Sequence, residues 1–238
     1  MPEVAQATAT IFERVAAVRR RIEASVQRAA RTPAEIKLIA VTKTHPAEIV
    51  REALNAGLTD FGENRVQEAE AKIAQLADGA ARWHLIGHLQ ANKVRRAVKL
   101  FDVIHSIDST TLVARLERLC AEEERRVLPV LLQIDLAGEA TKSGADVAAL
   151  PEMIEECQRC AHVRLVGLMT LPPYFDDAEQ VRPYFRRLRE LRDEWQRRGA
   201  FGASVGDLSM GMTHDFEVAI AEGATMVRVG TALFGARG

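Results

Sequence analysis

Short apolar runs alternate with amphipathic stretches along the whole chain. The runs are rich in Val, Ile and Leu and have the length of buried strands, whereas the stretches between them repeat apolar residues at helical spacing. Strands are therefore predicted at 36–42, 58–61, 83–87, 103–107, 128–135, 163–169, 205–209 and 226–230. Helices are predicted at 4–30, 46–56, 64–77, 90–99, 110–125, 146–160, 178–198 and 214–222.

Strands that alternate with helices favour parallel pairing through right-handed crossovers. Eight such units close naturally into a (β/α)8 TIM barrel, an α/β fold. We expect a single domain over residues 1–238, with an extra N-terminal helix within 1–30 and the barrel over 36–235. A doubly wound open sheet is the alternative, but no Gly-rich dinucleotide or P-loop motif follows the first strand.

Composition narrows the setting of this fold. Charged residues make up 27% of the chain and the formal net charge is −1, which argues against a general nucleic-acid binder. No run approaches the length of a membrane span, and three cysteines do not suggest a disulfide framework. We expect a cytoplasmic protein. Cys157 and Cys160 form a CxxC on a predicted helix without a second pair, so no metal site is expected.

The first strand, in the stretch IKLIAVTKTHP at 36–46, has a lysine at its end. Alternation places Lys43 on the same side as Ile39 and Val41. If that side faces the barrel interior, the lysine points into the mouth where barrel active sites lie. Partial desolvation lowers the pKa of such an amine and makes it a nucleophile for a carbonyl, with a Schiff base as product. A solvated loop lysine is the alternative, and position alone favours it.

Small residues follow the seventh and eighth strands, where this fold usually binds phosphate. The two stretches are GDLSMGMTHDF at 206–216 and MVRVGTALFG at 226–235. Ser209 offers a hydroxyl, Gly211 permits close backbone approach, and Gly230 and Thr231 add a second donor loop. Each piece alone also fits an ordinary turn. Two such loops opposite a candidate Schiff-base lysine together suggest a phosphorylated carbonyl compound.

Arg228 lies within the eighth predicted strand, on the same side as Met226 and Gly230. An arginine inside a strand needs an acceptor or a cavity. An ion pair with a barrel carboxylate is one interpretation, and a hydrogen bond to a cofactor ring is the other.

At this point the chain resembles the YggS/PROSC group, the pyridoxal-phosphate-binding homeostasis proteins, whose fold is similar to the N-terminal barrel of alanine racemase. The matching stretches are LIAVTKTHP, FGENRVQEAEAKI, WHLIGHLQANK, VIHSID, LLQIDLAGEATKSG, GLMTLPP and LSMGMTHDFEVAIAEGATMVRVGTALFG. They run in order through nearly the whole chain.

The resemblance implies a pyridoxal 5′-phosphate (PLP) site. Lys43 is the implied Schiff-base lysine, Arg228 faces the pyridine nitrogen, and Asn64 lies near the ring or its hydroxyl. The implied phosphate-holding residues are Ser209, Met210, Gly211, Gly230 and Thr231. His84 and Met169 sit in matching segments, where a core role fits each at least as well.

The sequence departs from the family pattern near the lysine, with Thr42 where Ser is common and His45 where Lys is common. Neither change removes the Schiff-base lysine. Lys142, after the fifth strand, is a second lysine on the same side of the barrel. Lys142 either receives the cofactor in transit or is an ordinary loop cation, and the second interpretation is favoured.

Arg228 also bears on the chemistry, because a guanidinium stays protonated and discourages protonation of the ring nitrogen. The ring is then a weak electron sink, which disfavours transamination. A racemase needs a second base, and only Tyr174 and Tyr184 offer a tyrosine. The chain ends at Gly238, directly after the eighth unit, so we expect the second racemase domain to be absent and the protein to be monomeric.

We therefore expect a protein of intracellular PLP homeostasis that holds PLP and buffers it or delivers it to PLP-dependent apo-enzymes, with no dedicated catalysis and no nucleic-acid or membrane partner. Two alternatives stay open. One is a weak PLP-dependent amino-acid racemase, and the other is a cofactor-free Schiff-base aldolase acting on a sugar phosphate. The arginines between 182 and 198 are expected to form a solvated helix face with ion pairs at helical spacing, and an RNA- or partner-binding role is a minor alternative.

Overall fold

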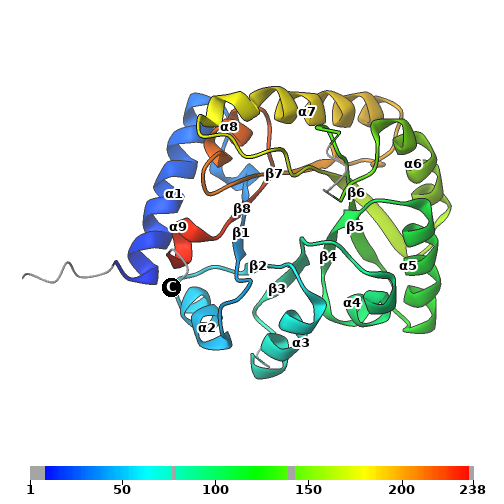
Figure 1. The fold of residues 1–238 in the computed structure, drawn as a ribbon, viewed down its shortest axis with the longest axis horizontal. Coiled ribbons are helices and arrows are strands. Elements are labelled where there is room, and N and C mark those ends of the chain that lie inside the picture. The colour runs from blue at the N-terminus through cyan, green and yellow to red at the C-terminus, as the bar shows by residue number, and fades with distance from the viewer. Residues whose placement is uncertain (1–8, 77–78, 139–142, 236–238) are drawn as a thin grey trace, which may run out of the picture.

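Eight parallel strands close into a barrel in the order of the sequence, and the first strand pairs with the last. The computed structural model describes residues 9–76, 79–138 and 143–235. The strands are β1 (Lys37–Val41), β2 (Asp60–Glu63), β3 (Arg82–Leu85), β4 (Val103–Ile107), β5 (Leu128–Gln133), β6 (Val163–Met169), β7 (Asp207–Met212) and β8 (Met226–Val229). The predicted (β/α)8 barrel is confirmed (Figure 1).

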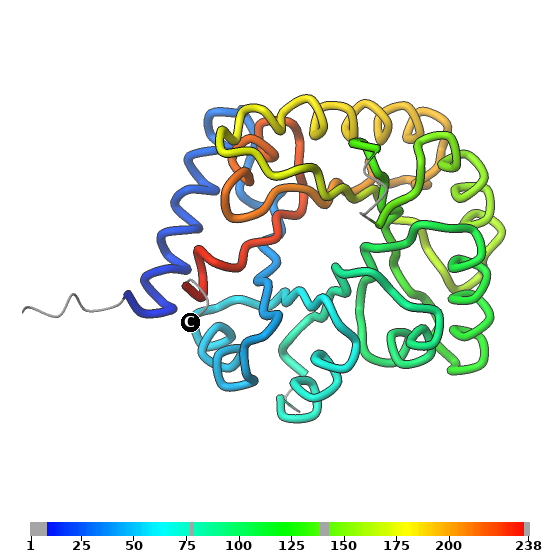
Figure 2. Tube along the Cα trace, viewed as in Figure 1, coloured from blue at the N-terminus to red at the C-terminus, as the bar shows by residue number. Residues whose placement is uncertain are grey.

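Helices surround the strands, and the chain trace follows a closed ring of βα units (Figure 2). The helices are α1 (Ile11–Arg28), α2 (Ala47–Asn55), α3 (Val66–Gln75), α4 (Val94–Leu100), α5 (Thr110–Glu122), α6 (Leu150–Arg159), α7 (Arg182–Arg197), α8 (Phe216–Ala221) and α9 (Thr231–Phe234). Short 3-10 turns cover Pro33–Glu35, Ala91–Lys93, Val147–Ala149 and Ala178–Val181. The sequence pattern does not predict α9, because a four-residue helix shows no periodicity.

The N-terminal helix α1 begins at Ile11 because Thr10 caps it. The Thr10 hydroxyl accepts from the Glu13 N–H, and the Glu13 carboxylate accepts from the Thr10 N–H, which is a capping box. Val15, Val18 and Ile22 are buried, as the predicted stripe requires. The helix lies beside α8 and α9 (Figure 1). Its predicted start at residue 4 lies outside the described residues.

The seventh strand differs most from its prediction, because it runs to Met212 rather than ending at 209. Its pairing with β8 shifts between Ser209 and Met212. Gly211 lies inside this shift at φ +91°, and a Cβ there would come 2.6 Å from the Cβ of Ala219 on α8. The end of this strand is not predicted because its residues are small or polar and lack an apolar pattern. Glycine is needed at position 211 because the strand passes close to α8 there.

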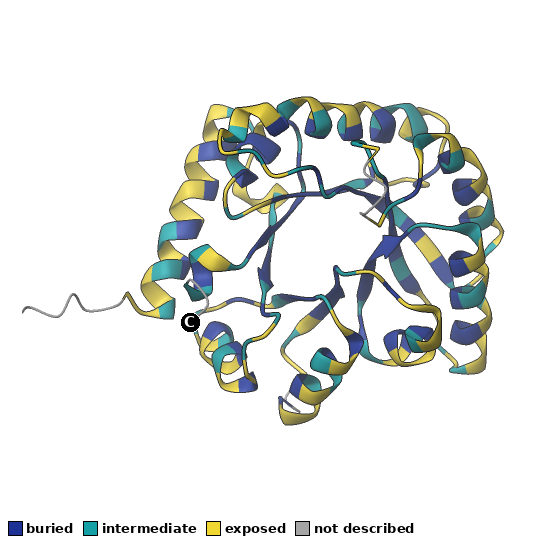
Figure 3. Cartoon of the chain, in the orientation of Figure 1, coloured by how far each residue is buried: buried dark blue, intermediate teal, exposed yellow. Residues whose placement is uncertain are grey.

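The interior has two apolar layers, and the strands between them are almost entirely buried (Figure 3). The larger layer lies between strands and helices. The smaller cluster lies inside the barrel and consists of Ile39, Val103, Leu131, Met169 and Met226, so Met169 has the core role anticipated for it. Buried polar side chains share the interior with this cluster.

The arginines of α7 form the predicted surface ion pairs, such as Arg187 with Glu190 and Arg198 with Glu194. Arg182, Arg186 and Arg189 additionally converge on Glu222, a buried carboxylate at the end of α8. These arginines therefore fasten α7 to its neighbour. Among the described residues, no helix combines the length and apolar character that crossing a membrane requires.

Candidate functional site

Lys43 lies in the turn that directly follows β1, and it is partly buried. Ile39, on the same side by alternation, belongs to the cluster inside the barrel. Thr42, on the opposite side, is fully buried, and its N–H donates to the Gly62 carbonyl of β2 at 3.1 Å. This arrangement agrees with the predicted alternation and places Lys43 at the carboxyl end of the barrel, where active sites of this fold lie.

A buried ion pair holds the backbone just before this lysine. Lys72 Nζ donates to the Thr42 carbonyl at 2.6 Å and to Glu63 Oε1 at 2.5 Å, and the Thr42 hydroxyl donates to the same Glu63 oxygen at 2.6 Å. We call Thr42, Glu63 and Lys72 the Thr42 clamp. Burial raises the pKa of Glu63, against the opposing hydrogen bonds from Lys72 and Thr42. Sequence reasoning does not single out the clamp, because α3 and β2 must first be packed together.

The residue after Lys43 is also held. The Thr44 N–H donates to Glu68 Oε2 on α3 at 3.1 Å, and Thr44 adopts φ +68°, a conformation that costs free energy for a β-branched residue. The backbone is therefore held on both sides of Lys43. Lys72 binds the Thr42 carbonyl, and Glu68 binds the Thr44 N–H. This arrangement fixes the turn that presents the lysine.

Arg228 is buried inside the barrel. Its Nη1 donates to Ser209 Oγ at 2.6 Å and its Nη2 donates to the Thr170 carbonyl at 2.9 Å. Among the described residues, no ion pair includes Arg228. The structure therefore does not support the interpretation that Arg228 pairs with a barrel carboxylate. Burial lowers the pKa of this guanidinium to about 10, while the charge of Asp215 acts in the opposite direction. The guanidinium is still protonated at neutral pH.

Ser209 is fully buried, and its hydroxyl is hydrogen-bonded to Arg228 and to His105 Nδ1 at 2.9 Å. Met210 packs in the layer between strands and helices. Ser209 therefore contacts Arg228, the predicted partner of the cofactor ring, and it lies within β7 rather than in the loop after this strand. A role of Ser209, Met210 and Gly211 in holding phosphate stays a prediction.

The loops after β7 and β8 meet at a hydroxyl that sequence reasoning missed. Thr213 Oγ1 accepts from the N–H groups of Gly230 and Ala232 at 3.3 and 3.4 Å, at the start of α9. The first N–H groups of a helix have no partner within it, and such groups suit an anion. The sequence signal for this contact is the threonine of the stretch MGMTH, which comes directly after β7. Gly230 also lies against β1, since a Cβ there would come 3.5 Å from Val41.

Asn64 follows β2 and is partly buried. It borders a cavity of about 400 Å³ whose lining also includes Gln67, His88 and Lys93. The adjoining chain packs tightly, because a Cβ on Gly87 would come 2.4 Å from the Asn64 carbonyl oxygen. Asn64 is therefore at the same end of the barrel as Lys43, and its contact with a cofactor ring stays a prediction. Lys142 lies outside the described residues.

The fold and this residue arrangement define a class. The family model "Alanine racemase, N-terminal domain" matches residues 14–238, which include the whole described barrel with Lys43 and Arg228.

Relatives define the group more narrowly. A pyridoxal phosphate homeostasis protein of Aquifex aeolicus is 46% identical over 225 residues, which cover 94% of this chain and 97% of the relative. Its counterpart in Pseudomonas aeruginosa is 45% identical over 231 residues, 96% of each chain. The structure of PipY of Synechococcus elongatus with PLP bound superposes with a TM-score of 0.83 at 41% identity, covering 95% of this chain and all of that one. The chain belongs to the family of pyridoxal phosphate homeostasis proteins.

Proposed function

We propose that this protein binds PLP and serves its homeostasis in the cell, holding the cofactor on Lys43 and buffering or delivering it. The observation that carries the proposal is Arg228, a cation buried inside the barrel on β8, which pairs with the strand β1 that Lys43 follows. The name of the relatives and the PLP bound to PipY support it.

The residues present fit the group. An amine, a buried guanidinium and a loop of backbone N–H donors match an aldehyde, a ring nitrogen and a phosphate respectively. The N–H groups of Gly230 and Ala232 reach Thr213 only over long distances of 3.3 and 3.4 Å, so they have donor capacity left for an anion. The donor set is therefore of the right kind and lies around one end of the barrel.

When bound, PLP supplies an aldehyde that amines attack reversibly. The Lys43 amine forms the bond to the aldehyde carbon, and the aldehyde oxygen leaves as water. The Thr42 clamp and the Thr44–Glu68 hydrogen bond hold the turn that carries this amine. Arg228 holds its own proton and donates a hydrogen bond, so it does not protonate the ring.

This arrangement favours holding over catalysis. Racemisation would need a second acid or base opposite Lys43. Tyr184 stacks on Phe175, and Tyr174 is 72% exposed beside His214. Neither tyrosine is hydrogen-bonded into a catalytic group in the part of the chain described. We infer further that PLP-dependent apo-enzymes receive the cofactor and that the protein acts as a cytoplasmic monomer of one domain.

A spectrum and a mass measurement test the proposal. Purified protein with PLP should show a visible absorption band, and borohydride reduction should place one pyridoxyl group on Lys43. Lys43→Ala should lose both signals. Lys93→Ala, which removes a lysine lining the cavity beside Asn64, should keep both. Equal labelling of wild type and Lys43→Ala would refute the assignment.

Two further measurements address the alternatives. Turnover of several amino acids at ordinary enzymatic rates would favour the racemase over the carrier. A protein that cleaves sugar phosphates without PLP would favour the aldolase. Light scattering after size-exclusion chromatography tests the monomer, and transfer of PLP to an apo-enzyme in the presence of a PLP scavenger tests direct delivery.

A further inference from the structure

A continuous chain of hydrogen bonds crosses the inside of the barrel. It starts at Arg228, whose Nη1 donates to Ser209 Oγ at 2.6 Å, and continues from Ser209 to His105 Nδ1 at 2.9 Å. His105 Nε2 meets His84 Nδ1 at 2.9 Å, and His84 Nε2 meets Asp60 Oδ1 at 2.8 Å. The chain therefore links β8, β7, β4, β3 and β2.

The two ends of this chain fix the direction of every bond in it. Arg228 has N–H donors and no acceptor, whereas an ionised Asp60 has acceptors and no donor. Asp60 accepts from His84, which therefore carries its proton on Nε2 and, as a neutral ring, accepts at Nδ1 from the Nε2–H of His105. A neutral His105 then accepts at Nδ1 from the Ser209 hydroxyl, and the Ser209 oxygen accepts from Arg228.

The surroundings support neutral histidines in this chain. Burial lowers the pKa of His84, although Asp60 acts against that change, and the pKa of the fully buried His105 falls well below its ordinary value for the same reason. Burial opposes ionisation of Asp60, but its hydrogen bond to His84 outweighs this effect, so its pKa is lowered. A neutral pair of imidazoles thus stands between one cation and one anion.

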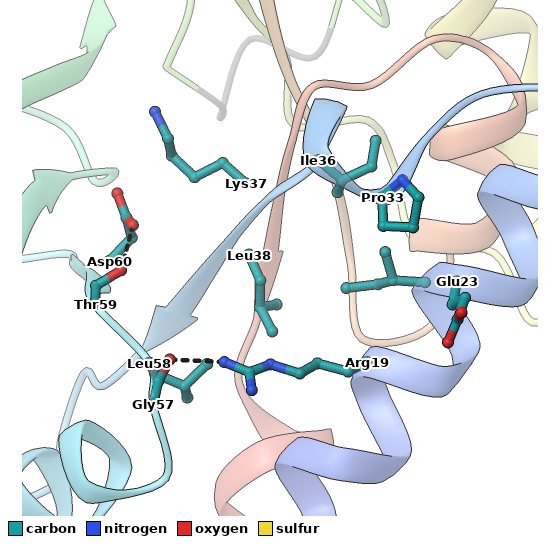
Figure 4. A pocket seen from close by; sticks show the side chains of 11 residues that line it. Arg19, Glu23, Pro33, Ile36, Lys37, Leu38, Gly57, Leu58, Thr59 and Asp60 are labelled. Atoms are coloured by element: carbon teal, nitrogen blue, oxygen red, sulfur yellow. Dashed lines mark hydrogen bonds between the residues drawn. The ribbon is translucent and has the colours of Figure 1, made fainter.

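The far end of the chain lies away from the cofactor site. Asp60 is the first residue of β2, and it borders a cavity of about 480 Å³ at the amino-terminal end of β1, together with Lys37, Leu38 and Arg19 (Figure 4). Lys43, in contrast, follows the carboxyl end of β1. The chain therefore crosses the barrel interior from Arg228 to a carboxylate at the amino-terminal end of β2, although both residues lie opposite Ile39 of β1 in the strand register.

We propose that His84 and His105, acting through Ser209, are positioning residues for Arg228, with Asp60 as the terminal acceptor that locks their tautomers. With its tautomer locked, His105 accepts a hydrogen bond from the Ser209 hydroxyl, and the serine oxygen is oriented to accept from the guanidinium. If the tautomers were free, Ser209 would face competing donors and Arg228 would lose a fixed partner. The cofactor part of this proposal rests on the proposed function, whereas the tautomer pattern does not.

The pattern is tested first on the protein without cofactor. Nitrogen-15 NMR of the histidine rings should show His84 and His105 as neutral Nε2–H tautomers at neutral pH. In Asp60→Ala, both rings should populate a second tautomer. Asp207→Ala is the control, because this carboxylate also begins a strand and accepts a hydrogen bond from Thr225, yet lies outside the chain. It should leave both tautomers unchanged.

Cofactor binding is tested next on the same variants. Asp60→Ala should weaken PLP binding about threefold to tenfold, the effect of disturbing about one hydrogen bond, and should shift the visible band. Asp207→Ala should alter neither quantity. Asp60→Asn keeps an acceptor oxygen, so it should retain wild-type tautomers and affinity. If the alanine variant does not fold, the asparagine variant still tests the proposal, because any change in its tautomers should be accompanied by a change in its affinity.

Three results would overturn the proposal. One is an Nδ1–H tautomer of either ring in wild-type protein. Another is Asp60→Ala protein with altered tautomers but wild-type affinity and band. The third is Asp60→Asn protein with altered tautomers and unchanged binding. Failure of wild-type protein to bind PLP at all would instead contradict the proposed function, while the tautomer measurement would still decide whether the chain has this direction.

Discussion

At the scale of single residues, two of the places where this barrel buries charge bear on groups predicted to meet PLP. Arg228 satisfies its donors with a hydroxyl and a carbonyl. Lys72 and Glu63 pair with each other behind the Lys43 turn. Buried charges cost free energy unless they are paired or hydrogen-bonded. These contacts hold the Arg228 guanidinium and the turn that carries Lys43 in fixed positions.

The Thr42 clamp makes a prediction about stability. Lys72→Met should destabilise the protein by about 3–5 kcal/mol, because it leaves the Glu63 carboxylate buried without its partner. The double variant Glu63→Gln/Lys72→Met should recover part of this loss. Urea unfolding measures both. Arg198→Met, which breaks the exposed pair with Glu194, should change stability by less than about 1 kcal/mol. A similar small effect of Lys72→Met would show that the buried pair has no structural role.

Thr213 makes a prediction about the ligand. Thr213→Val keeps the shape of the side chain but removes the hydroxyl that receives the Gly230 and Ala232 N–H groups. Without the hydroxyl, the loop after β8 loses its hydrogen bonds to the loop after β7, and its N–H donors are less firmly positioned. If this loop holds phosphate, PLP should bind about threefold to tenfold more weakly, whereas pyridoxal without phosphate should bind as to wild type. Equilibrium titration of both ligands measures the difference. Equal weakening for both would place Thr213 away from the phosphate.

At the scale of elements, helix α5 is joined to the start of β6 by one carboxylate. Glu117 accepts from the backbone N–H groups of Ala161, His162 and Val163 and from the His162 ring. Burial raises the pKa of Glu117, but these hydrogen bonds outweigh it and lower the pKa to about 2. The connection between α5 and β6 therefore depends on the ionisation of Glu117.

The sign of the resulting pH dependence follows from this shift. A carboxyl with a lowered folded-state pKa stabilises the fold above its ordinary value of 4.5 and loses that contribution as the pH falls toward 2. Glu117→Gln should therefore cost about 1–3 kcal/mol at pH 7 and much less near pH 2. Urea unfolding at several pH values checks this expectation. Glu155→Gln, in an exposed pair with Arg159, is the control and should show little change.

At the scale of the whole molecule, the eight βα units follow from the sequence, and the barrel follows from their number. The positions of Lys43 and Arg228 also follow, because each stands out as a charge within or beside an apolar strand, and their contact with PLP stays a prediction. Other features depend on packing that periodicity does not report. His84 and His105 become partners only once β3 and β4 are neighbours, and the place of Ser209 depends on an irregular strand rich in small residues.

Ligand binding should stabilise the whole barrel. A ligand present at a hundred times its dissociation constant adds about 2.7 kcal/mol to the free energy of unfolding. PLP should therefore raise the melting temperature of wild-type protein, and Lys43→Ala should lose most of this increase. Scanning calorimetry measures it. An equal increase in both proteins would indicate that PLP binds at other lysines.

The pairing of β1 with β8 has a consequence for synthesis on the ribosome. Ile39 of β1 lies opposite Arg228 of β8. Lys43, in the turn after β1, and Arg228 are the two predicted cofactor-binding side chains that carry charge, and they are 185 residues apart in sequence. A growing chain carries its lysine long before the arginine is made. Until the eighth strand docks, the nascent polypeptide lacks Arg228 beside the Lys43 turn, so we expect the complete set of predicted cofactor-binding groups to form only in the last step of assembly.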